Sequence, residues 1–176
     1  MGQILTECCM EIRMLSAPDT DAWLRLRVRA LRDHPDAFGR AAEEADTAEE
    51  WRRRFETNEN GREGFLLGAF EVGLVGAVGC QRARGQRVRH AAMLWGMYVA
   101  PEARRRGIGA ALLDAAIARA RAWPDLDHLT LGVMRHQTPA RRLYLSRGFG
   151  TTGCHPRALR VGDAYYDEEQ MLLRLG

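Results

Sequence analysis

The sequence predicts an α/β (α+β) fold in a single domain, with strands and helices interspersed around one mixed sheet. Three observations favour it. The 176 residues, 19.8 kDa in mass, are enough for one domain whose core needs neither disulfide nor metal. Strand-like apolar runs alternate with segments of helical periodicity along the chain. The stretch 95–111 passes from an apolar strand through three arginines and two glycines into a small-residue helix.

The composition is that of an ordinary globular protein, with 46% hydrophobic and 28% charged residues. No apolar run approaches the roughly 20 residues that span a bilayer, and no cleavable signal precedes the domain. We therefore expect a cytoplasmic protein without a membrane partner. The net charge of +3 is small, although all 26 basic residues are arginine, and it implies no nucleic-acid partner.

The four cysteines, Cys8, Cys9, Cys80 and Cys154, include no C-x-x-C pair and no metal-ligand spacing. We expect no disulfide framework and no metal site, with a reducing compartment as the default. Cys154 and His155 together would supply half a metal site, and no second pair accompanies them.

Residues 1–9 satisfy the N-myristoylation pattern, with Gly2 and Thr6 in the required places. The pattern is short, and the first predicted strand begins only at Met10. We expect 1–9 to be a disordered N-terminal extension, or the product of an upstream start codon, and 10–176 to be the folded domain.

The first strand is predicted over 10–15, and a turn at 16–19 leads into a helix. Pro35 ends this helix, because proline disfavours helical geometry at the residue before it. The apolar stripe of the helix is expected to hold Leu24, Val28 and Leu31.

A second helix is predicted to begin near Thr47, which forms a capping-box pattern with Glu50. Trp51 and Phe55 give it an apolar edge. Acidic residues precede and begin this helix, where the positive end of the helix dipole stabilises negative charge. Attraction of a cationic substrate is the alternative interpretation of these acids. These acids are Glu43, Glu44, Asp46, Glu49 and Glu50.

The middle of the chain reads as a hairpin of two strands, 65–70 and 74–80, after a turn cluster at 58–61. The basic segment 82–90 is expected to be a mobile, solvated loop rather than a nucleic-acid patch. A central strand follows over 91–99.

The second half alternates helix and strand. A helix that carries Ile108, Ala111, Leu112 and Ala115 on one face ends at Pro124, and a strand follows over 128–134. A short helix then starts with Thr138 as N-cap and Pro139 at its first position, and Gly148 closes it. The last strands are expected around 150–156 and 165–174, joined by a loop at 157–166.

The loop between the central strand and the next helix has the features of an anion site. Gly107 and Gly109 leave the backbone open, and the first amides of the helix have no intrahelical partner. Three arginines, 104–106, add forked donors suited to phosphate oxygens. The spacing fits neither G-x-x-x-x-G-K-[ST] nor the dinucleotide pattern G-x-G-x-x-G, so a pyrophosphate site of another kind is predicted.

Arg104-Arg105-Arg106-Gly107-Ile108-Gly109 resembles the [RQ]-x-x-G-x-[GA] signature of the GCN5-related N-acetyltransferases, the GNAT superfamily. The segments 97–99 and 101–102 also match this family. Downstream, 138–149 resembles its A-x-x-L-Y-x-x-x-G-F pattern. The resemblance implies the acetyltransferase fold, a mixed, mostly antiparallel sheet of about seven strands with about four helices, and makes 10–176 an N-acetyltransferase domain.

The resemblance implies an enzyme that moves an acetyl group from acetyl-CoA, its co-substrate, to a primary amine by direct transfer in a ternary complex. The acceptor stays open: small amines, amino-acid-like compounds, aminated antibiotics, and protein N-termini or lysines all fit. Members of the family often form homodimers. A non-catalytic acyl-CoA-binding regulatory module is the alternative, and a protein that binds ATP or NAD is a third, weaker one.

The resemblance also assigns residues. The backbone of 97–99 would pair with the pantetheine arm, and 104–110 would hold the pyrophosphate. Tyr144 would serve as general acid toward the coenzyme sulfur, whereas the structural alternative buries it on one helix face with Ala140 and Leu143. The residues expected to bind the coenzyme are Met97, Tyr98, Val99, Arg104, Arg105, Arg106, Gly107, Ile108, Gly109, Ala110, Gln137 and Tyr144.

The sequence departs from the family in two places. Gln137 stands where members often have asparagine, and Trp95 stands where many carry a glutamate base. His136 and Glu168 are possible bases by location, and a water chain or an already neutral amine are the alternatives. Trp95 is predicted to shape an apolar or aromatic acceptor pocket, to which Phe38, Tyr165 and Tyr166 could contribute.

Overall fold

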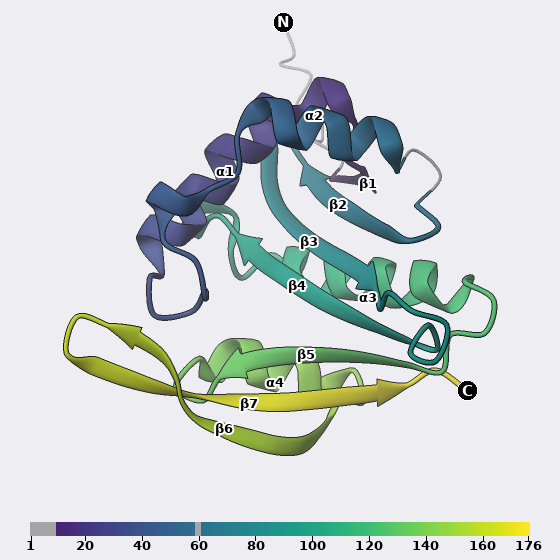
Figure 1. Ribbon diagram of the computed structural model, residues 1–176. Helices are drawn as coiled ribbons and strands as arrows, with labels where there is room; N and C mark the ends of the chain where they lie inside the picture. The colour runs from purple at the N-terminus through teal and green to yellow at the C-terminus, as the bar shows by residue number, and fades with distance from the viewer. Residues whose placement is uncertain (1–9, 59–60) are drawn as a thin grey trace, which may run out of the picture.

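A computed structural model of the chain describes residues 10–58 and 61–176. Within these residues seven strands form one sheet in the order β1-β2-β3-β4-β5-β7-β6, and four α-helices pack on it (Figure 1). The α/β (α+β) class and the single mixed sheet predicted from the sequence are confirmed. The extension expected at 1–9, with its myristoylation pattern and two cysteines, lies outside the described residues.

The elements follow the predicted order. Short 3-10 turns at 17–19, 42–44 and 101–103 connect some of them. The strands and helices are β1 (Glu11–Met14), α1 (Thr20–Asp33), α2 (Ala48–Thr57), β2 (Gly64–Phe70), β3 (Leu74–Arg82), β4 (Ala91–Val99), α3 (Ile108–Arg121), β5 (His128–Met134), α4 (Thr138–Ser146), β6 (Gly150–Val161) and β7 (Ala164–Arg174).

The sheet is antiparallel except where β4 meets β5, which run parallel. These two strands pair only over 91–93 and 128–130. Beyond Met93 and Thr130 they diverge, and Figure 1 shows the widening gap between them. The sheet therefore consists of two parts, β1–β4 and β5–β7, with a wedge-shaped opening between them that we call the splay.

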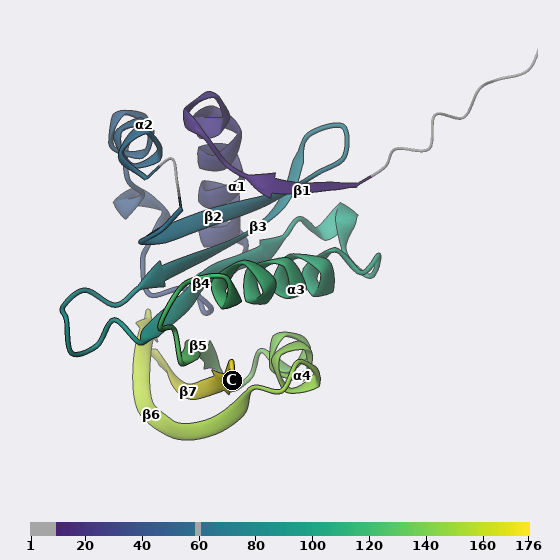
Figure 2. The ribbon, with the colours of Figure 1, turned by 90° about the vertical axis from the view of Figure 1, so that its right-hand side faces the viewer.

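The helices cover both faces of the sheet. Figure 2 shows α1 and α2 on one face and α3 and α4 on the other. Alternate strand residues feed two cores, because successive side chains of a strand point to opposite faces. Leu112, Leu113 and Ala116 of α3 belong to the larger core, and Trp23 and Trp51 belong to the core under α1 and α2.

Helix α1 buries a different stripe from the predicted one. Leu24 and Val28 are only partly buried, and Leu31 alone of the predicted three is buried. Besides Leu31, the apolar positions that α1 buries are Trp23, Leu26 and Ala30. Both stripes have helical spacing, and the indole of Trp23, which packs edge-on against Trp51 and Trp95, selects the observed one.

Two predicted loops are partly strand. Strand β6 continues to Val161, so the loop expected at 157–166 is an extended hairpin with a turn at 162–163 and an irregularity between His155 and Leu159. Strand β3 continues to Arg82, which is 5% exposed and donates hydrogen bonds to the carbonyls of Arg89 and Pro124, each at 2.6 Å. Residues 84–90 of the basic segment are exposed, as expected of a solvated loop.

Two helix ends show how local signals act. Thr47 caps α2 as predicted: its Oγ1 accepts from the backbone of Glu50, whose carboxylate accepts from the backbone of Thr47. Helix α4 starts one residue earlier than predicted, with Gln137 rather than Thr138 at the N-cap. Gly148 closes α4 with a φ of +86°, the left-handed geometry that favours glycine.

No helix among the described residues is long and apolar enough to cross a membrane.

Candidate functional site

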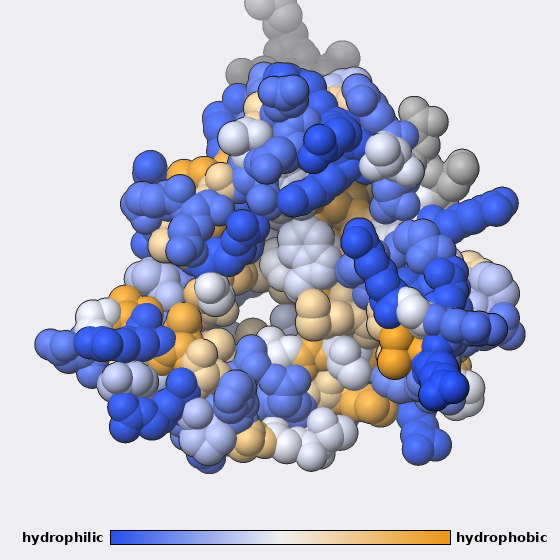
Figure 3. All heavy atoms as spheres, in the orientation of Figure 1, coloured by the Kyte–Doolittle hydropathy of each residue, from blue (hydrophilic) through white to orange (hydrophobic). Residues whose placement is uncertain are grey.

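A cleft of about 1010 Å³ occupies the splay. Its walls come from both faces of the sheet: the start of α3 and α4 on one side, and α1 with the segment after it on the other. Figure 3 shows the hollow from the face that carries α1 and α2. A ligand in this cleft would therefore lie between β4 and β5 and be reachable from both faces.

Strand β4 carries a bulge inside the cleft. Trp95 pairs with Gly79 and Tyr98 with Ala77, so the two residues between Trp95 and Tyr98 face only one on β3. Gly96 has a φ of +66°, which glycine adopts without strain. Gly96 and Met97 have no register partner on β3, and no residue of β4 beyond Met93 pairs with β5. Backbone groups of β4 are thus free to hydrogen-bond an extended ligand.

The predicted anion loop opens into the same cleft. Gly107, at φ +80°, is the N-cap of α3, and a side chain added there would meet nothing within 4 Å. The first intrahelical bond runs from the amide of Ala111 to Gly107, so the amides of 108–110 face outward at the positive end of the helix dipole. Residues 107–110 all line the cleft.

The three consecutive arginines have three different environments. Arg104 donates from Nε to the carbonyl of Val99 at 2.8 Å and from a terminal nitrogen to Nε2 of His34 at 2.9 Å. Arg106 is ion-paired with Glu71 at 2.6 Å and does not line the cleft. Arg105, at φ +61°, is exposed, lines the cleft, and forms no ion pair with any described residue.

Tyr144 lies on α4 with its ring edge-on to Phe149 at 5.9 Å, and it lines the cleft although only 7% of it is exposed. Burial raises the pKa of the phenol to about 12. No described residue hydrogen-bonds its hydroxyl. Tyr144 is thus a neutral donor at the wall of the cleft, beside Ala140 and Leu143, which pack partly into the core.

Of the predicted coenzyme residues, all but Arg106 line the cleft. Gln137 does so at the start of α4, where its amide nitrogen lies 3.1 Å from Nε2 of His136. Not all of the predicted acceptor residues reach the cleft. Trp95 and Phe38 line it, whereas Tyr166 does not and instead packs against His136, with the rings tilted and 5.0 Å between their centroids.

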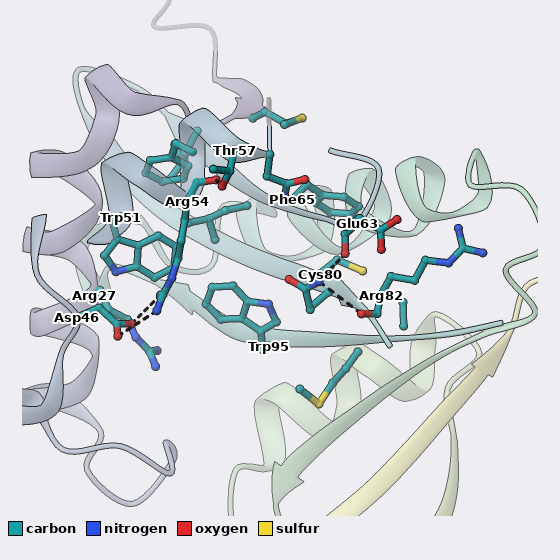
Figure 4. Close-up of a pocket in the computed structure, with 18 of the residues that line it drawn as sticks. Arg27, Asp46, Trp51, Arg54, Thr57, Glu63, Phe65, Cys80, Arg82 and Trp95 are labelled. Atoms are coloured by element: carbon teal, nitrogen blue, oxygen red, sulfur yellow. Dashed lines mark hydrogen bonds and ion pairs between the residues drawn. The ribbon is translucent and has the colours of Figure 1, made fainter. Parts of the chain in front are cut away.

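A second cavity of about 1310 Å³ adjoins the cleft. The two share four wall residues, Arg27, Arg40, Met93 and Trp95. Trp95 stacks on Trp51, with 6.1 Å between ring centroids, and Phe55 packs against Trp51 at 5.6 Å. Figure 4 shows Trp51 and Trp95 facing each other, with Arg27, Asp46 and Arg54 at their edge. We call this the aromatic cavity.

The two possible bases differ in position. His136 lies outside the cleft wall and holds the carboxylate of Asp36 at 2.8 Å. Glu168 lines the cleft, and its carboxylate lies against the α-carbon of Gly132, where any side chain would collide with it. β4 contributes no carboxylate.

The acidic approach to α2 is engaged in the structure. Asp46 is ion-paired with Arg40 at 3.0 Å and with Arg54 at 2.8 Å. Glu50 accepts the capping hydrogen bonds, and Glu44 accepts one from the backbone of Ala41 at 3.0 Å. These contacts favour the helix-capping interpretation over attraction of a cationic substrate.

Sequence reasoning missed Arg27, His34 and Asp36. Arg27 lies among alternating arginines and apolar residues of α1, where no local signal sets it apart from Arg25 or Arg29. His34 and Asp36 belong to a segment interpreted only as a helix end. Their partners, Arg104 and His136, lie 70 and 100 residues further along the chain, and only the fold brings them together.

Comparison with known proteins places the chain among acetyltransferases. The sequence profile described as "Acetyltransferase (GNAT) family" matches residues 23–149. A GNAT-family acetyltransferase from Streptococcus pneumoniae has a TM-score of 0.87 and 24% identity, over 96% of this chain and 100% of that one.

Two further solved structures have the same fold. A ribosomal-protein-alanine N-acetyltransferase from Brucella melitensis has a TM-score of 0.80 and 24% identity, over 94% of this chain and 99% of that one. A phosphinothricin acetyltransferase from Sinorhizobium meliloti, in complex with acetyl-CoA, has a TM-score of 0.80 and 20% identity, over 95% and 89%. At these identities the likeness concerns the fold.

Proposed function

The chain belongs to the acetyltransferase (GNAT) family, and we propose that it transfers the acetyl group of acetyl-CoA to a primary amine within the splay. One observation carries the proposal: free backbone of the β4 bulge and the open N-terminus of α3 line the same cleft. Acetyl-CoA combines an extended pantetheine arm, which the free backbone of β4 can hydrogen-bond, with a pyrophosphate, which the N-terminus of α3 can bind. The acetyl-CoA complex of the Sinorhizobium meliloti enzyme, which shares this fold, supports the choice of co-substrate.

In the proposed complex the pyrophosphate accepts hydrogen bonds from the amides of 108–110. Arg105 adds a guanidinium that lines the cleft and has no hydrogen bond or ion pair with any described residue. Arg104 acts indirectly, because its bonds to Val99 and His34 fix the loop against the end of β4. The pantetheine arm hydrogen-bonds the backbone of 97–99, and Gln137 lines the opposite wall.

The transfer is a direct displacement. The lone pair of the acceptor amine attacks the thioester carbon, the N–C bond forms, and the C–S bond breaks with its electron pair on sulfur. The nitrogen loses one proton and the thiolate gains one, so the products are an amide and coenzyme A. A backbone amide near Met97 would stabilise the carbonyl oxygen as negative charge develops on it.

Tyr144 is the proposed catalytic residue toward sulfur. With a pKa of about 12 its phenol is protonated throughout the neutral range. A thiol has a pKa near 8.5, so full proton transfer from Tyr144 to the thiolate would be uphill. The better role is donation of a hydrogen bond that stabilises the thiolate while a water molecule supplies the proton.

Removal of the amine proton has fewer candidates. Glu168 is the better placed of the two predicted bases, because it lines the cleft and His136 does not. If the amine arrives neutral, or if a chain of water molecules accepts its proton, neither residue is needed as a base. Variants Glu168→Gln and His136→Gln compared over the pH range would separate these alternatives, because an acting base produces the acidic limb of the pH–rate profile and its substitution removes that limb.

A covalent acetyl-enzyme finds no support. Burial raises the pKa of the Cys80 thiol to about 12, which leaves almost no thiolate to attack. Cys154 is exposed on β6 and is not among the residues that line the cleft. Transfer within a ternary complex remains the proposal.

The test is coenzyme A release from acetyl-CoA across a panel of amines and peptides, with wild type and Tyr144→Phe compared. Acceptor-dependent release that falls about tenfold or more in the variant supports the enzyme and the role of Tyr144. Tight acetyl-CoA binding without release for any acceptor would favour a regulatory acyl-CoA-binding module instead. Failure to bind acetyl-CoA would overturn the assignment of 104–110.

Trp95 is proposed to shape the acceptor site, because it lies between the cleft and the aromatic cavity. Trp95→Ala is expected to alter turnover of acceptors that carry an apolar part. Normal turnover of every acceptor by this variant would refute the role. The cytoplasmic location and the homodimer expected from the sequence remain predictions.

A further inference from the structure

Two charged residues, Arg27 of α1 and Arg40, line both cavities, and of these only Arg40 is ion-paired within the described residues, with Asp46. Nη1 of Arg27 lies 3.7 Å from where a β-carbon on Gly96 would be, so the guanidinium faces the β4 bulge. Figure 4 shows it near Asp46, at the edge of the space between Trp51 and Trp95.

The Nη1 donor of Arg27 has no hydrogen-bond partner in the described part of the chain, and the atom is buried. A buried donor without a partner is costly, and a native structure that keeps one needs a reason. The other such atom, Nε1 of Trp23, lines neither cavity. Among the described residues, Arg27 alone therefore combines a buried donor that lacks a partner with a place on the wall of the site.

The charge of Arg27 is not balanced locally. The carboxylate whose charge acts on Arg27 is that of Asp46, and Arg40 and Arg54 already hold it in ion pairs. Burial, together with the like charge of Arg40, lowers the pKa of the Arg27 guanidinium. Three guanidinium groups thus share one carboxylate beside the site, and an incoming anion would relieve their repulsion.

The guanidinium is also held in place without being neutralised. Its carbon lies 4.9 Å from the ring centroid of Phe38, a cation–π contact that orients the planar group and leaves its in-plane donors available. A guanidinium held in this orientation suits a carboxylate, which can accept two parallel hydrogen bonds from its in-plane donors.

We propose that Arg27 binds the carboxylate of the acceptor, and that the acceptor is a free α-amino acid whose apolar or aromatic side chain occupies the aromatic cavity. The inference rests on the proposed function, since it places the acetyl carbonyl beside Gly96 and Met97. With the guanidinium at Gly96, the carboxylate and the attacking nitrogen must lie a few ångströms apart. In an α-amino acid two bonds separate the nitrogen from the carboxylate carbon.

The same geometry argues against other acceptors. The side-chain amine of a lysine residue is too far from any carboxylate of its own residue, and the α-amine of a peptide N-terminus is followed by an amide. Neither gives Arg27 an anion. An amine without a carboxylate would leave the buried Nη1 of Arg27 without a partner, which selects against such an acceptor.

The test uses three compounds with one side chain: L-phenylalanine, L-phenylalaninamide and 2-phenylethylamine. With wild type, kcat/KM for the free acid should exceed that for the other two by about 100-fold or more, as expected for a desolvated charge pair. Arg27→Met should remove this preference by slowing the free acid alone, and Arg27→Lys should restore part of it. Arg25→Met, an exposed arginine on the same helix, is the matched control and should change neither.

Equilibrium binding of L-phenylalanine to the complex with coenzyme A separates this inference from the proposed function. A Kd that rises about 30-fold or more in Arg27→Met supports the carboxylate site even if no acceptor is turned over, in which case the proposed catalysis fails and the site stands. Equal use of acid, amide and amine by wild type would overturn the inference and leave the acetyltransferase intact. The inference would also be overturned if Arg27→Met left the Kd of L-phenylalanine unchanged, or if wild type neither bound L-phenylalanine nor preferred the free acid as acceptor.

Discussion

The indole of Trp95 lies against the α-carbon of Gly79, its register partner on β3. A β-carbon on Gly79 would come within 2.1 Å of the indole ring. The absence of a side chain at Gly79 therefore allows Trp95 to fold over β3 and stack on Trp51. The shape of the aromatic cavity depends on a residue that does not line it.

Gly79→Ala is accordingly expected to push Trp95 out of its position. The overpacking should lower the free energy of unfolding by about 1–3 kcal/mol, measured by denaturant unfolding. It should also raise KM for acceptors with apolar side chains while leaving acetyl-CoA affinity unchanged. Gly73→Ala is the control, because nothing lies within 4 Å of that position; equal effects of the two substitutions would contradict the relationship.

The arginines of the loop should differ in their effect on coenzyme affinity. Arg105→Met removes the exposed guanidinium on the cleft wall, and we expect acetyl-CoA to bind about 3- to 30-fold more weakly, with a reduced dependence on salt. Arg106→Met should change affinity less than twofold, since Arg106 pairs with Glu71 outside the cleft. Calorimetric titration at two salt concentrations gives both quantities. A larger loss in Arg106→Met would show that the pairing with Glu71 is exchanged for the coenzyme.

The raised pKa of Tyr144 predicts how its contribution varies with pH. A group whose pKa is raised to about 12 keeps its proton below that value, so donation to the leaving sulfur should not fade in the working range. The ratio of kcat between wild type and Tyr144→Phe should stay constant from about pH 6 to about pH 10. A ratio that collapses toward one near pH 8 would mean that another group titrates in the role assigned to Tyr144.

Asp19 predicts an acid limit for stability. Its carboxylate accepts from Arg13 at 2.7 and 2.8 Å and from the backbone and hydroxyl of Ser16. These bonds, that of Arg13 first, lower the pKa of Asp19 from 3.8 to about 2. A lowered pKa stabilises the fold above the unfolded value, and this contribution is lost as pH falls from about 4 to about 2.

Asp19→Asn should lower the free energy of unfolding by about 1–3 kcal/mol at neutral pH. The difference between variant and wild type should shrink as the pH falls toward 2. Thermal unfolding between pH 2 and pH 7 measures this difference. A difference that does not vary with pH would mean that the ion pair with Arg13 contributes nothing measurable.

Local patterns were sufficient to predict most elements of this fold. The capping box at Thr47 and the glycine at 148 act through bonds to residues within four positions, and they appear where expected. The stripe of α1 was mispredicted because α1 is apolar at both phases, and the choice between them is made by Trp51 and Trp95. The extension of β6 came from its pairing with β7, which follows it in the chain.

The candidate site divides in the same way. Gly107, Gly109 and Tyr144 belong to contiguous motifs, so their position around one cleft could be anticipated. The partner of Arg106 and the isolation of Arg27 could not, because both depend on side chains brought in from other elements. Tyr166 packs against His136 and does not line the cleft, because it belongs to the β6–β7 hairpin, part of which was interpreted from the sequence as a loop.

The splay also gives the molecule the topology of a ring. The β4–β5 ladder joins its two parts at one end, the pair of Asp114 with Arg147 ties them on the side of α3 and α4, and that of Asp36 with His136 ties them on the side of α1. A long ligand can enter a closed ring either end first or after one of these side-chain pairs has broken. The pair of Asp36 with His136 is partly exposed and hence weak, whereas the larger core also joins the two parts on the side of α3 and α4. Asp36→Asn should therefore raise the association and dissociation rate constants of acetyl-CoA together, so that the ring sets the speed of exchange more than the affinity.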